Sequence, residues 1–356
     1  MKALMFSDNF FTDQVFEKII KNRPFWKDVE KKYFNTGWPK QPFISEGKLK
    51  EFNPYPEEAL EEARDCEIII TEMGCVDQEL IDASDKLKLI ACLRSGPVNV
   101  DVDYATEKKI PVIFAPYRST KAVAEFTLGL IIALRRHLVR ANSNLRKGIW
   151  LQEELFLYDV APPPLEEQQI GFIGFGNIPR VLSNLLKTFG CRMVATDPYV
   201  SWEIMSDYEV EKIEMEELLS TSDIISLHVR ASGDNENMIG EKEFSLMKPQ
   251  ALFINTARGK LVDEGALFRA LSEGKIAGAA IDTFWDEPWK TMSPLADLEN
   301  VILTPHIAGA SRSTAEDGAA AIVNLVEKYF AGDYESVIPF CKNPEVFNNR
   351  EGVEEQ

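Results

Sequence analysis

Cysteine is scarce in this sequence, and its distribution excludes several classes of protein. The 356 residues include only five cysteines, with no Cys-x-x-Cys pair and an odd count: Cys66, Cys75, Cys92, Cys191 and Cys341. Scattered single thiols are typical of reduced, mostly buried side chains in a cytoplasmic protein. They argue against a disulfide-bonded secreted domain, and the sequence predicts no metal site.

Positive charge and long apolar runs are also in short supply. The chain has 39 Lys and Arg against 57 Asp and Glu, a formal net charge of −18. Such a surface would repel nucleic acid and anionic membranes, so neither is predicted as a partner. The most apolar stretch, 122–134, contains Glu125 and is too short to cross a bilayer. The amino-terminal residues do not resemble a signal peptide.

A strand, a glycine turn and a helix follow one another in the middle of the chain. Residues 170–173 predict a buried strand, Gly174 and Gly176 a tight turn, and the apolar spacing over 177–189 a helix. This order is typical of a dinucleotide-binding unit, in which a pyrophosphate approaches Gly176 and the positive end of the helix. Pro179 stands where a third glycine is usual, and we expect it to loosen the packing of helix on strand.

The carboxylate that such a unit requires is also present. The next predicted strand, 192–196, ends at Asp197, about 20 residues after the glycine turn. Asp197 can accept hydrogen bonds from both hydroxyls of an adenosine ribose and would repel a 2′-phosphate. Because no arginine follows it closely, the sequence favours NAD over NADP.

Strands and helices alternate over most of the rest, which predicts parallel sheets. Residues 23–56 lack periodicity and predict an irregular excursion with one strand near Tyr33. A single long helix is predicted over 119–147, apolar in its first half and basic in its second. Arg118 and Lys121 lie at its start. They are either solvated, or face a cleft and suit a phosphorylated or larger sugar acid.

The three histidines can be weighed one by one. His137 falls within the predicted long helix and is expected at the surface. His228 ends a strand at the ligand-binding edge of the sheet, where it either packs or touches a cofactor. His306 directly follows a strand, and taken alone such a histidine is more often structural than catalytic.

Other polar residues with useful chemistry also lie at strand ends. Arg258, Asp282, Glu287 and His306 are all predicted at the carboxyl edge of one parallel sheet. A guanidinium can hold the carboxylate of a 2-keto acid and polarise its keto oxygen. An imidazolium can give that oxygen a proton while hydride reaches the carbon, and a carboxylate can fix the tautomer and raise the pKa of the imidazole.

Taken together, these segments resemble the D-isomer-specific 2-hydroxyacid dehydrogenase family, which includes phosphoglycerate, glycerate and D-lactate dehydrogenases. The likeness runs over about residues 67–330. It is carried by the glycine turn, Asp197, Asn255-Thr256-Ala257-Arg258-Gly259, Val262-Asp263-Glu264, Asp282, Glu287-Pro288, Pro305-His306 and Ala122-Val123-Ala124-Glu125-Phe126.

The resemblance implies a role for each matching residue. Arg258, Glu287 and His306 are the implied catalytic set. The implied cofactor-binding residues are Gly174, Gly176, Asn177, Ile178, Asp197, Val229, Thr256, Ala257, Asp282 and Gly309. The turn of Arg94, Ser95 and Gly96 is implied to bind the substrate together with Arg258. This turn is shorter than the glycine-rich loop of many members, which leaves the contacts to the far end of the substrate open.

The resemblance also implies an architecture. We expect an α/β protein with two doubly wound parallel-sheet, Rossmann-like domains. A flavodoxin-like substrate-binding domain would comprise 1–118 and 310–342, the NAD-binding domain 119–309, and a loosely ordered tail 343–356, with the active site in the cleft between the domains.

The expected function is NAD-dependent oxidation of a D-2-hydroxy acid or reduction of a 2-keto acid, the substrate being glycerate, phosphoglycerate or a sugar acid. By family likeness a homodimer joined through the 119–147 helix is expected. Two alternatives stay open. One is an NAD-sensing corepressor on the same fold. The other is a formate or phosphite dehydrogenase, and Glu287 argues against the formate type, which pairs its histidine with glutamine.

Overall fold

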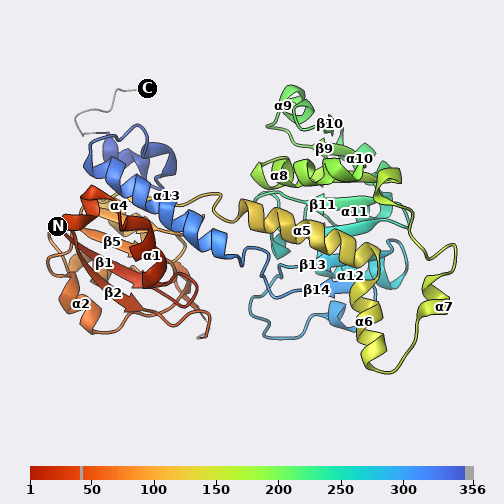
Figure 1. The fold of residues 1–356 in the computed structure, drawn as a ribbon, viewed down its shortest axis with the longest axis horizontal. Coiled ribbons are helices and arrows are strands. Elements are labelled where there is room, and N and C mark those ends of the chain that lie inside the picture. Colours follow the sequence, from red (N-terminus) through yellow and green to blue (C-terminus); the bar gives the residue numbers. More distant parts are fainter. Residues whose placement is uncertain (41–42, 349–356) are drawn as a thin grey trace. The chain divides into compact units, whose positions relative to one another are not determined.

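The computed structural model describes residues 1–40 and 43–348, and these form two compact units. One unit comprises Met1–Arg118 and the chain from Ser311 onward, and the other comprises Ser119–Ala310 (Figure 1). The chain therefore builds part of the first unit, then the whole second unit, and then returns to the first. Within residues 1–40 and 43–348, no helix is both long enough and apolar enough to span a lipid bilayer.

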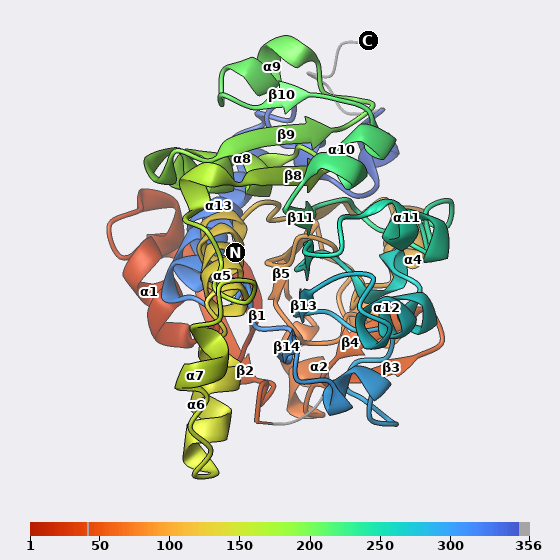
Figure 2. The same cartoon turned by 90° about the vertical axis from the view of Figure 1, so that its right-hand side faces the viewer.

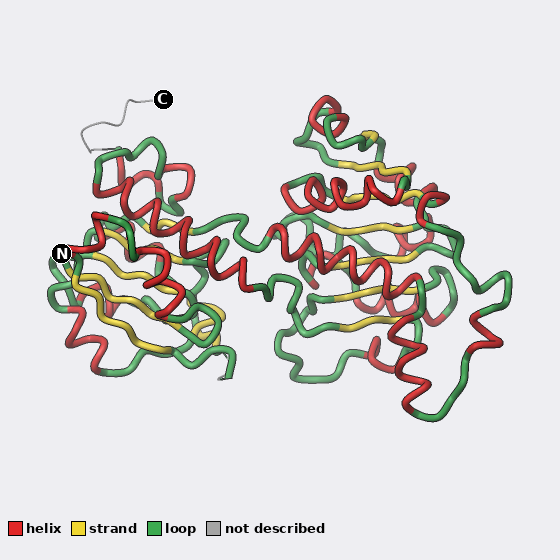
Figure 3. The backbone as a smooth tube through the Cα atoms, in the orientation of Figure 1, coloured by secondary structure: helices red, strands yellow, loops and turns green. Residues whose placement is uncertain are grey.

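The first unit is a five-stranded parallel sheet between two helix layers (Figure 3). Its strands, in spatial order, are β2 (Glu30–Asn35), β1 (Lys2–Ser7), β5 (Ile68–Thr71), β6 (Leu89–Cys92) and β7 (Val112–Phe114). One face is covered by α1 (Asp13–Ile20) and α13 (Arg312–Phe330), the other by α2 (Glu58–Ala63), α3 (Gln78–Asp82) and α4 (Val102–Glu107). Leaving aside the separate hairpin of β3 (Ile44–Glu46) and β4 (Leu49–Phe52), this is the flavodoxin-like strand order.

The second unit is a seven-stranded parallel sheet. Its strands, in spatial order, are β10 (Glu211–Lys212), β9 (Arg192–Thr196), β8 (Gln169–Ile173), β11 (Ile224–Leu227), β12 (Leu252–Asn255), β13 (Gly278–Ile281) and β14 (Val301–Leu303). On one face lie α5 (Thr120–Arg135), α8 (Asn177–Leu186) and α9 (Trp202–Ser206), and on the other α10 (Met215–Thr221), α11 (Glu241–Leu246) and α12 (Glu264–Ser272) (Figure 2). The order reverses between β8 and β11, as in a Rossmann fold. The predicted fold class is confirmed.

Local sequence signals account for several of these elements. Helix α1 begins at Thr12, whose hydroxyl accepts a hydrogen bond from the Val15 N–H, and it buries Phe16 and Ile20 against the sheet. The central strands are buried on both faces, which explains their unbroken apolar runs such as Ile68–Thr71. All five cysteines are free and buried, as predicted.

The prediction of one continuous helix over 119–147 is wrong, because the structure has two helices there. Helix α5 ends at Arg135, and α6 (Leu138–Arg146) begins only after His137, which adopts a left-handed conformation with φ of 53°. A left-handed residue cannot continue a right-handed helix, so the chain changes direction there. His137 is consequently a half-buried junction residue, not a surface residue within a helix. A short helix, α7 (Gln152–Leu155), follows.

Two further regions are more ordered than the sequence indicated. The excursion 23–56 contains the predicted strand, β2, and also an antiparallel hairpin of β3 (Ile44–Glu46) and β4 (Leu49–Phe52). At the carboxyl end, residues 343–348 belong to the packed structure of the first unit. Phe347 is fully buried, and the Asn343 side chain accepts a hydrogen bond from the Val112 N–H at 2.8 Å. The rest of the expected tail, 349–356, lies outside the described residues.

Candidate active site

The predicted catalytic side chains come from consecutive strands of the seven-stranded sheet. Arg258 follows β12, Glu287 follows β13, and His306 follows β14. Because all these strands are parallel, their carboxyl ends share one edge, and the three segments leave the sheet at that edge.

His306 and Glu287 form a close pair. The imidazole Nδ1 lies 2.6 Å from Glu287 Oε2, and the other carboxylate oxygen accepts a hydrogen bond from the Phe284 N–H at 2.7 Å. The hydrogen bond to Glu287 raises the pKa of His306, and burial and the nearby positive charge of Arg258 oppose that effect. Arg258 is therefore close enough to His306 to influence its protonation. The His306 side chain is 43% exposed, so it is accessible to a substrate.

Asp282 holds the loop that carries His306. Its carboxylate, which is fully buried, accepts hydrogen bonds from the Thr304 hydroxyl at 2.6 Å and from the Ile307 and Ala308 N–H groups at 2.9 Å each. Its backbone carbonyl accepts from the His306 N–H at 2.8 Å. These bonds stabilise His306 in a left-handed conformation, φ 52°. Sequence reasoning missed this anchoring role, and Thr304 with it.

Asn255 organises the turn that carries Arg258. It is fully buried, its side-chain oxygen accepts from the Ala257 N–H at 3.0 Å, and its amide donates to the Arg258 carbonyl at 3.1 Å. The Arg258 side chain is exposed and donates to the Ala257 carbonyl at 2.6 Å. An asparagine at a strand end, two residues before a bonded N–H, is a recognisable turn signal that sequence analysis did not use.

The glycine turn fits the pyrophosphate of a dinucleotide. Gly174 has a φ of 87°, and a Cβ there would lie 2.9 Å from the His228 carbonyl oxygen, so only glycine suits the position. Gly176 is exposed, with open space where its Cβ would be, and it begins α8 without a side-chain cap. The N–H groups of the first turn of α8, which starts at Asn177 and Ile178, are therefore available to a phosphate oxygen.

Asp197 lies where the ribose hydroxyls of such a cofactor are expected. One carboxylate oxygen accepts from the Phe175 N–H at 2.8 Å, and the other from the Tyr199 and Val200 N–H groups at 2.8 and 3.2 Å. The residue therefore ties the glycine turn to the loop after β9. The oxygen that accepts from Phe175 keeps a second lone pair, which is available to a ribose hydroxyl.

The other predicted cofactor residues line the same edge of the sheet. The Thr256 hydroxyl contacts that of Thr127 on α5 at 3.1 Å, so its side chain is turned into the protein. Val229 and Gly309 are half-buried. His228 lies 2.9 Å from the Ser226 hydroxyl, and burial lowers the pKa of its imidazole to about 3, so it remains neutral at physiological pH.

In the first unit, the predicted substrate-binding turn follows β6. Among the described residues, the N–H groups of Ser95 and Gly96 donate to no protein acceptor. The Arg94 guanidinium, by contrast, is already engaged: it forms an ion pair with the Glu51 carboxylate and donates to the Glu51 carbonyl at 2.8 Å. Arg94 thereby holds the β3–β4 hairpin beside the turn.

Arg118 is also paired. Its guanidinium donates two hydrogen bonds to the Glu72 carboxylate, at 2.6 and 2.9 Å, and Glu72 is only 2% exposed. Of the two alternatives for Arg118, a solvated helix start is wrong, because the side chain forms a buried ion pair. Lys121 is exposed.

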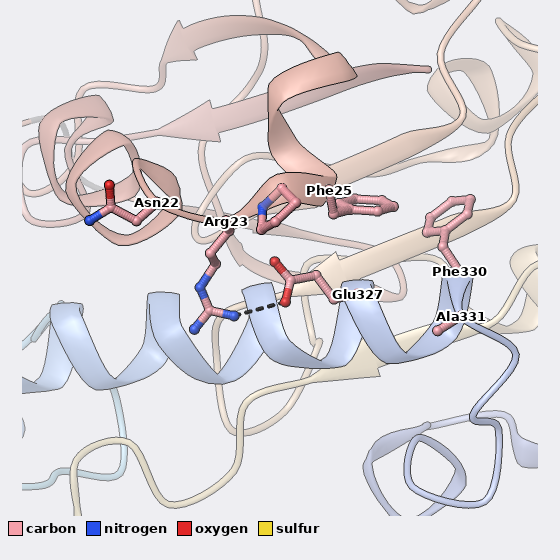
Figure 4. Close-up of a pocket in the computed structure, with 7 residues that line it drawn as sticks. Asn22, Arg23, Phe25, Glu327, Phe330 and Ala331 are labelled. Atoms are coloured by element: carbon pink, nitrogen blue, oxygen red, sulfur yellow. Dashed lines mark hydrogen bonds and ion pairs between the residues drawn. The ribbon is translucent and has the colours of Figure 1, made fainter.

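A hollow of about 340 Å³ lies elsewhere in the first unit, between the loop after α1 and the end of α13 (Figure 4). An ion pair of Arg23 and Glu327, 2.9 Å apart, and the rings of Phe25 and Phe330 line it. It contains none of the predicted site residues. In the part of the chain that the structure describes, no group of three or more His, Cys, Asp or Glu side chains is arranged to hold a metal ion.

Comparison with known proteins connects this geometry to a family. Residues 128–308 match the model of the D-isomer-specific 2-hydroxyacid dehydrogenase NAD-binding domain. The chain is 38% identical over 280 residues to a D-3-phosphoglycerate dehydrogenase of Methanocaldococcus jannaschii; the match covers 78% of this chain and 52% of that protein. The chain thus spans about half the length of that relative.

Two further relatives are matched over more of their length. Identity to a glyoxylate reductase of Thermococcus litoralis is 38% over 272 residues, which cover 75% of this chain and 82% of that enzyme. The D-lactate dehydrogenase of Aquifex aeolicus, solved with NAD and lactic acid, is 28% identical with a TM-score of 0.69, and covers 96% of this chain and 99% of its own.

Proposed function

Because the chain belongs to the D-isomer-specific 2-hydroxyacid dehydrogenase family, with NAD as cofactor, we propose that it interconverts a 2-keto acid and a D-2-hydroxy acid through Arg258, Glu287 and His306. The observation that carries this proposal is the 2.6 Å pair of His306 and Glu287 within reach of the Arg258 charge. A base, the carboxylate that orients it and a cation for an anionic substrate occupy one sheet edge, next to a glycine turn that fits the cofactor.

Each side chain has a distinct role in the proposed reduction. Bound NADH supplies the hydride that adds to C2 of the substrate. Arg258 binds the substrate carboxylate and polarises the keto oxygen. His306, protonated and held by Glu287, donates its proton to that oxygen, which becomes the hydroxyl group. In the reverse direction, neutral His306 accepts the hydroxyl proton.

We further propose that the free N–H groups of Ser95 and Gly96 bind the substrate. Arg94 then acts by fixing this turn, because its guanidinium is engaged by Glu51. The substrate itself is proposed to be a small or phosphorylated hydroxy acid, as in the relatives named above. The pairing of Arg118 with Glu72 removes one candidate phosphate ligand, which favours the unphosphorylated acids.

The decisive experiment measures NADH oxidation by the purified protein with 2-keto acids. Glyoxylate, hydroxypyruvate and longer acids are compared, each with and without a terminal phosphate where one exists. His306→Ala should lower kcat by roughly 10²- to 10⁴-fold while NADH binding persists, and Arg258→Ala should reduce both turnover and substrate affinity. His137→Ala, in the same unit, is the control. Near-full activity of His306→Ala would overturn the acid/base assignment.

We propose that the protein forms a homodimer through the segment that begins with α6. Residues 138–158 of this segment expose an unusual concentration of large apolar side chains, among them Trp150 at 70%, Phe156 at 78% and Tyr158 at 95%. An exposed apolar surface of this kind marks an interface. Sedimentation of the wild type should give twice the chain mass, and Phe156→Asp should give the monomer. A monomeric wild type would contradict the proposal.

A further inference from the structure

Gly259, directly after Arg258, makes an exceptionally close contact with another loop. It is buried at the start of a short 3₁₀ turn, Gly259–Leu261. A Cβ at this position would lie 2.1 Å from the carbonyl carbon of Phe284, 2.3 Å from its oxygen and 2.6 Å from the Trp285 nitrogen. These are backbone atoms, so no side-chain rotation can relieve the contact. By comparison, a Cβ at Gly171 would meet only side chains, those of Ser222 and Leu218.

The loop that Gly259 contacts is the one that holds the catalytic carboxylate. The Phe284 N–H donates to one oxygen of Glu287 at 2.7 Å, and the other oxygen lies 2.6 Å from His306 Nδ1. A hydrogen bond also joins the two segments that meet at Gly259, because Trp285 Nε1 donates to the Val262 carbonyl at 2.5 Å. The backbone that carries Arg258 and the backbone that orients Glu287 are therefore in direct contact.

We propose that Gly259 is a positioning residue: its missing side chain sets the distance between Arg258 and the Glu287–His306 pair. The proposal rests on the proposed function, since it assigns a purpose to the spacing of those three side chains. An alanine at 259 must push the 284–287 segment away from the 258–262 segment. Glu287 then moves relative to His306, and Arg258 moves relative to both.

The substitution Gly259→Ala tests this idea, with Gly233→Ala as the matched control. Gly233 is exposed in the same unit, and a Cβ there meets nothing within 4 Å. For Gly259→Ala we expect kcat to fall by roughly 10- to 100-fold and the KM for the keto acid to rise, because small displacements of reacting groups are costly. The KM for NADH should stay within about twofold of the wild type, since the glycine turn is untouched. Gly233→Ala should match the wild type.

A second readout does not depend on turnover. The chain has only three histidines, so NMR can follow the titration of each imidazole. His306 should titrate at lower pH in Gly259→Ala than in the wild type, and the other two histidines should not change. In Glu287→Gln, adding Gly259→Ala should shift the His306 titration less than it does in the wild type, because the hydrogen bond to the Glu287 carboxylate is already lost.

The outcomes separate the two proposals. If the wild type reduces no 2-keto acid but Gly259→Ala still shifts the His306 titration, the proposed function fails and the positioning role stands. If Gly259→Ala leaves both kcat and the His306 titration unchanged, the positioning role is wrong. Should Gly259→Ala not fold, Trp285→Phe, which removes the bond to Val262 without adding an atom, should change kcat and the titration in the same directions, and an unchanged Trp285→Phe would overturn the proposal.

Discussion

Replacing Glu287 by glutamine should move the pH dependence of both reaction directions to lower pH. The hydrogen bond to Glu287 is the largest factor that raises the pKa of His306. With Phe284 still donating to the amide oxygen, the amide N–H₂ would face Nδ1, which disfavours the imidazolium. The pKa of His306 should then fall. Reduction, which needs protonated His306, should be lost at lower pH than in the wild type, and oxidation, which needs neutral His306, should extend to lower pH.

The size of the effect follows from the exposure of the pair. A hydrogen bond to a charged group contributes about 1.5–3 kcal/mol, and because His306 is 43% exposed we take the lower end. About 1.5 kcal/mol corresponds to a roughly tenfold lower kcat for reduction at neutral pH. The assay is initial-rate kinetics in both directions across pH.

Asp286→Asn provides the matched control, since it removes the neighbouring charge, which pairs with Lys290 at 3.5 Å and not with His306. The reasoning is refuted if the pH dependence of either direction fails to move to lower pH in Glu287→Gln, or if the control shifts equally.

Three further predictions concern stability and cofactor choice. Arg118→Met should destabilise the first unit by about 3–5 kcal/mol in urea denaturation, because it strands the buried Glu72 carboxylate, and adding Glu72→Leu should recover most of the loss. Phe347→Ala should cost about 3–5 kcal/mol by the same measurement, whereas an unaffected midpoint would mean that this residue does not pack as described. Asp197→Ala should raise the KM for NADH about tenfold and reduce the preference of the enzyme for NADH over NADPH. An unchanged preference in steady-state kinetics would contradict the proposed contact of Asp197 with the ribose.

The sequence alone predicted the features that depend on local patterns and on the geometry of parallel sheets. The strands are apolar runs bounded by turn residues, and the glycine turn followed about 20 residues later by Asp197 has the spacing of a dinucleotide-binding unit. Arg258, Glu287 and His306 could be brought together because carboxyl ends of parallel strands share one edge, a rule that needs no coordinates. The family, the fold class and the NAD cofactor followed from the same residues and are confirmed.

What the sequence could not supply were pairings between distant segments. Nothing near Arg94 in the chain indicates that Glu51 binds it, and nothing near Arg118 points to Glu72. No sequence signal indicates the break in the helix at His137 either, because the residues on both sides favour a helix. In each case tertiary contacts decide the outcome, and local propensity has no access to them.

The return of the chain to its first unit has a consequence for biosynthesis. Helix α13 and Phe347 supply a large part of the apolar cluster on the α1 face of the first sheet, yet they are translated after the whole Ser119–Ala310 unit. On the ribosome the second unit is therefore complete while the first still has an uncovered sheet, which calls for protection from aggregation until the last helix emerges. Pulse-labelled nascent chains should accordingly become protease-resistant in the middle of the sequence before they do so at the amino end.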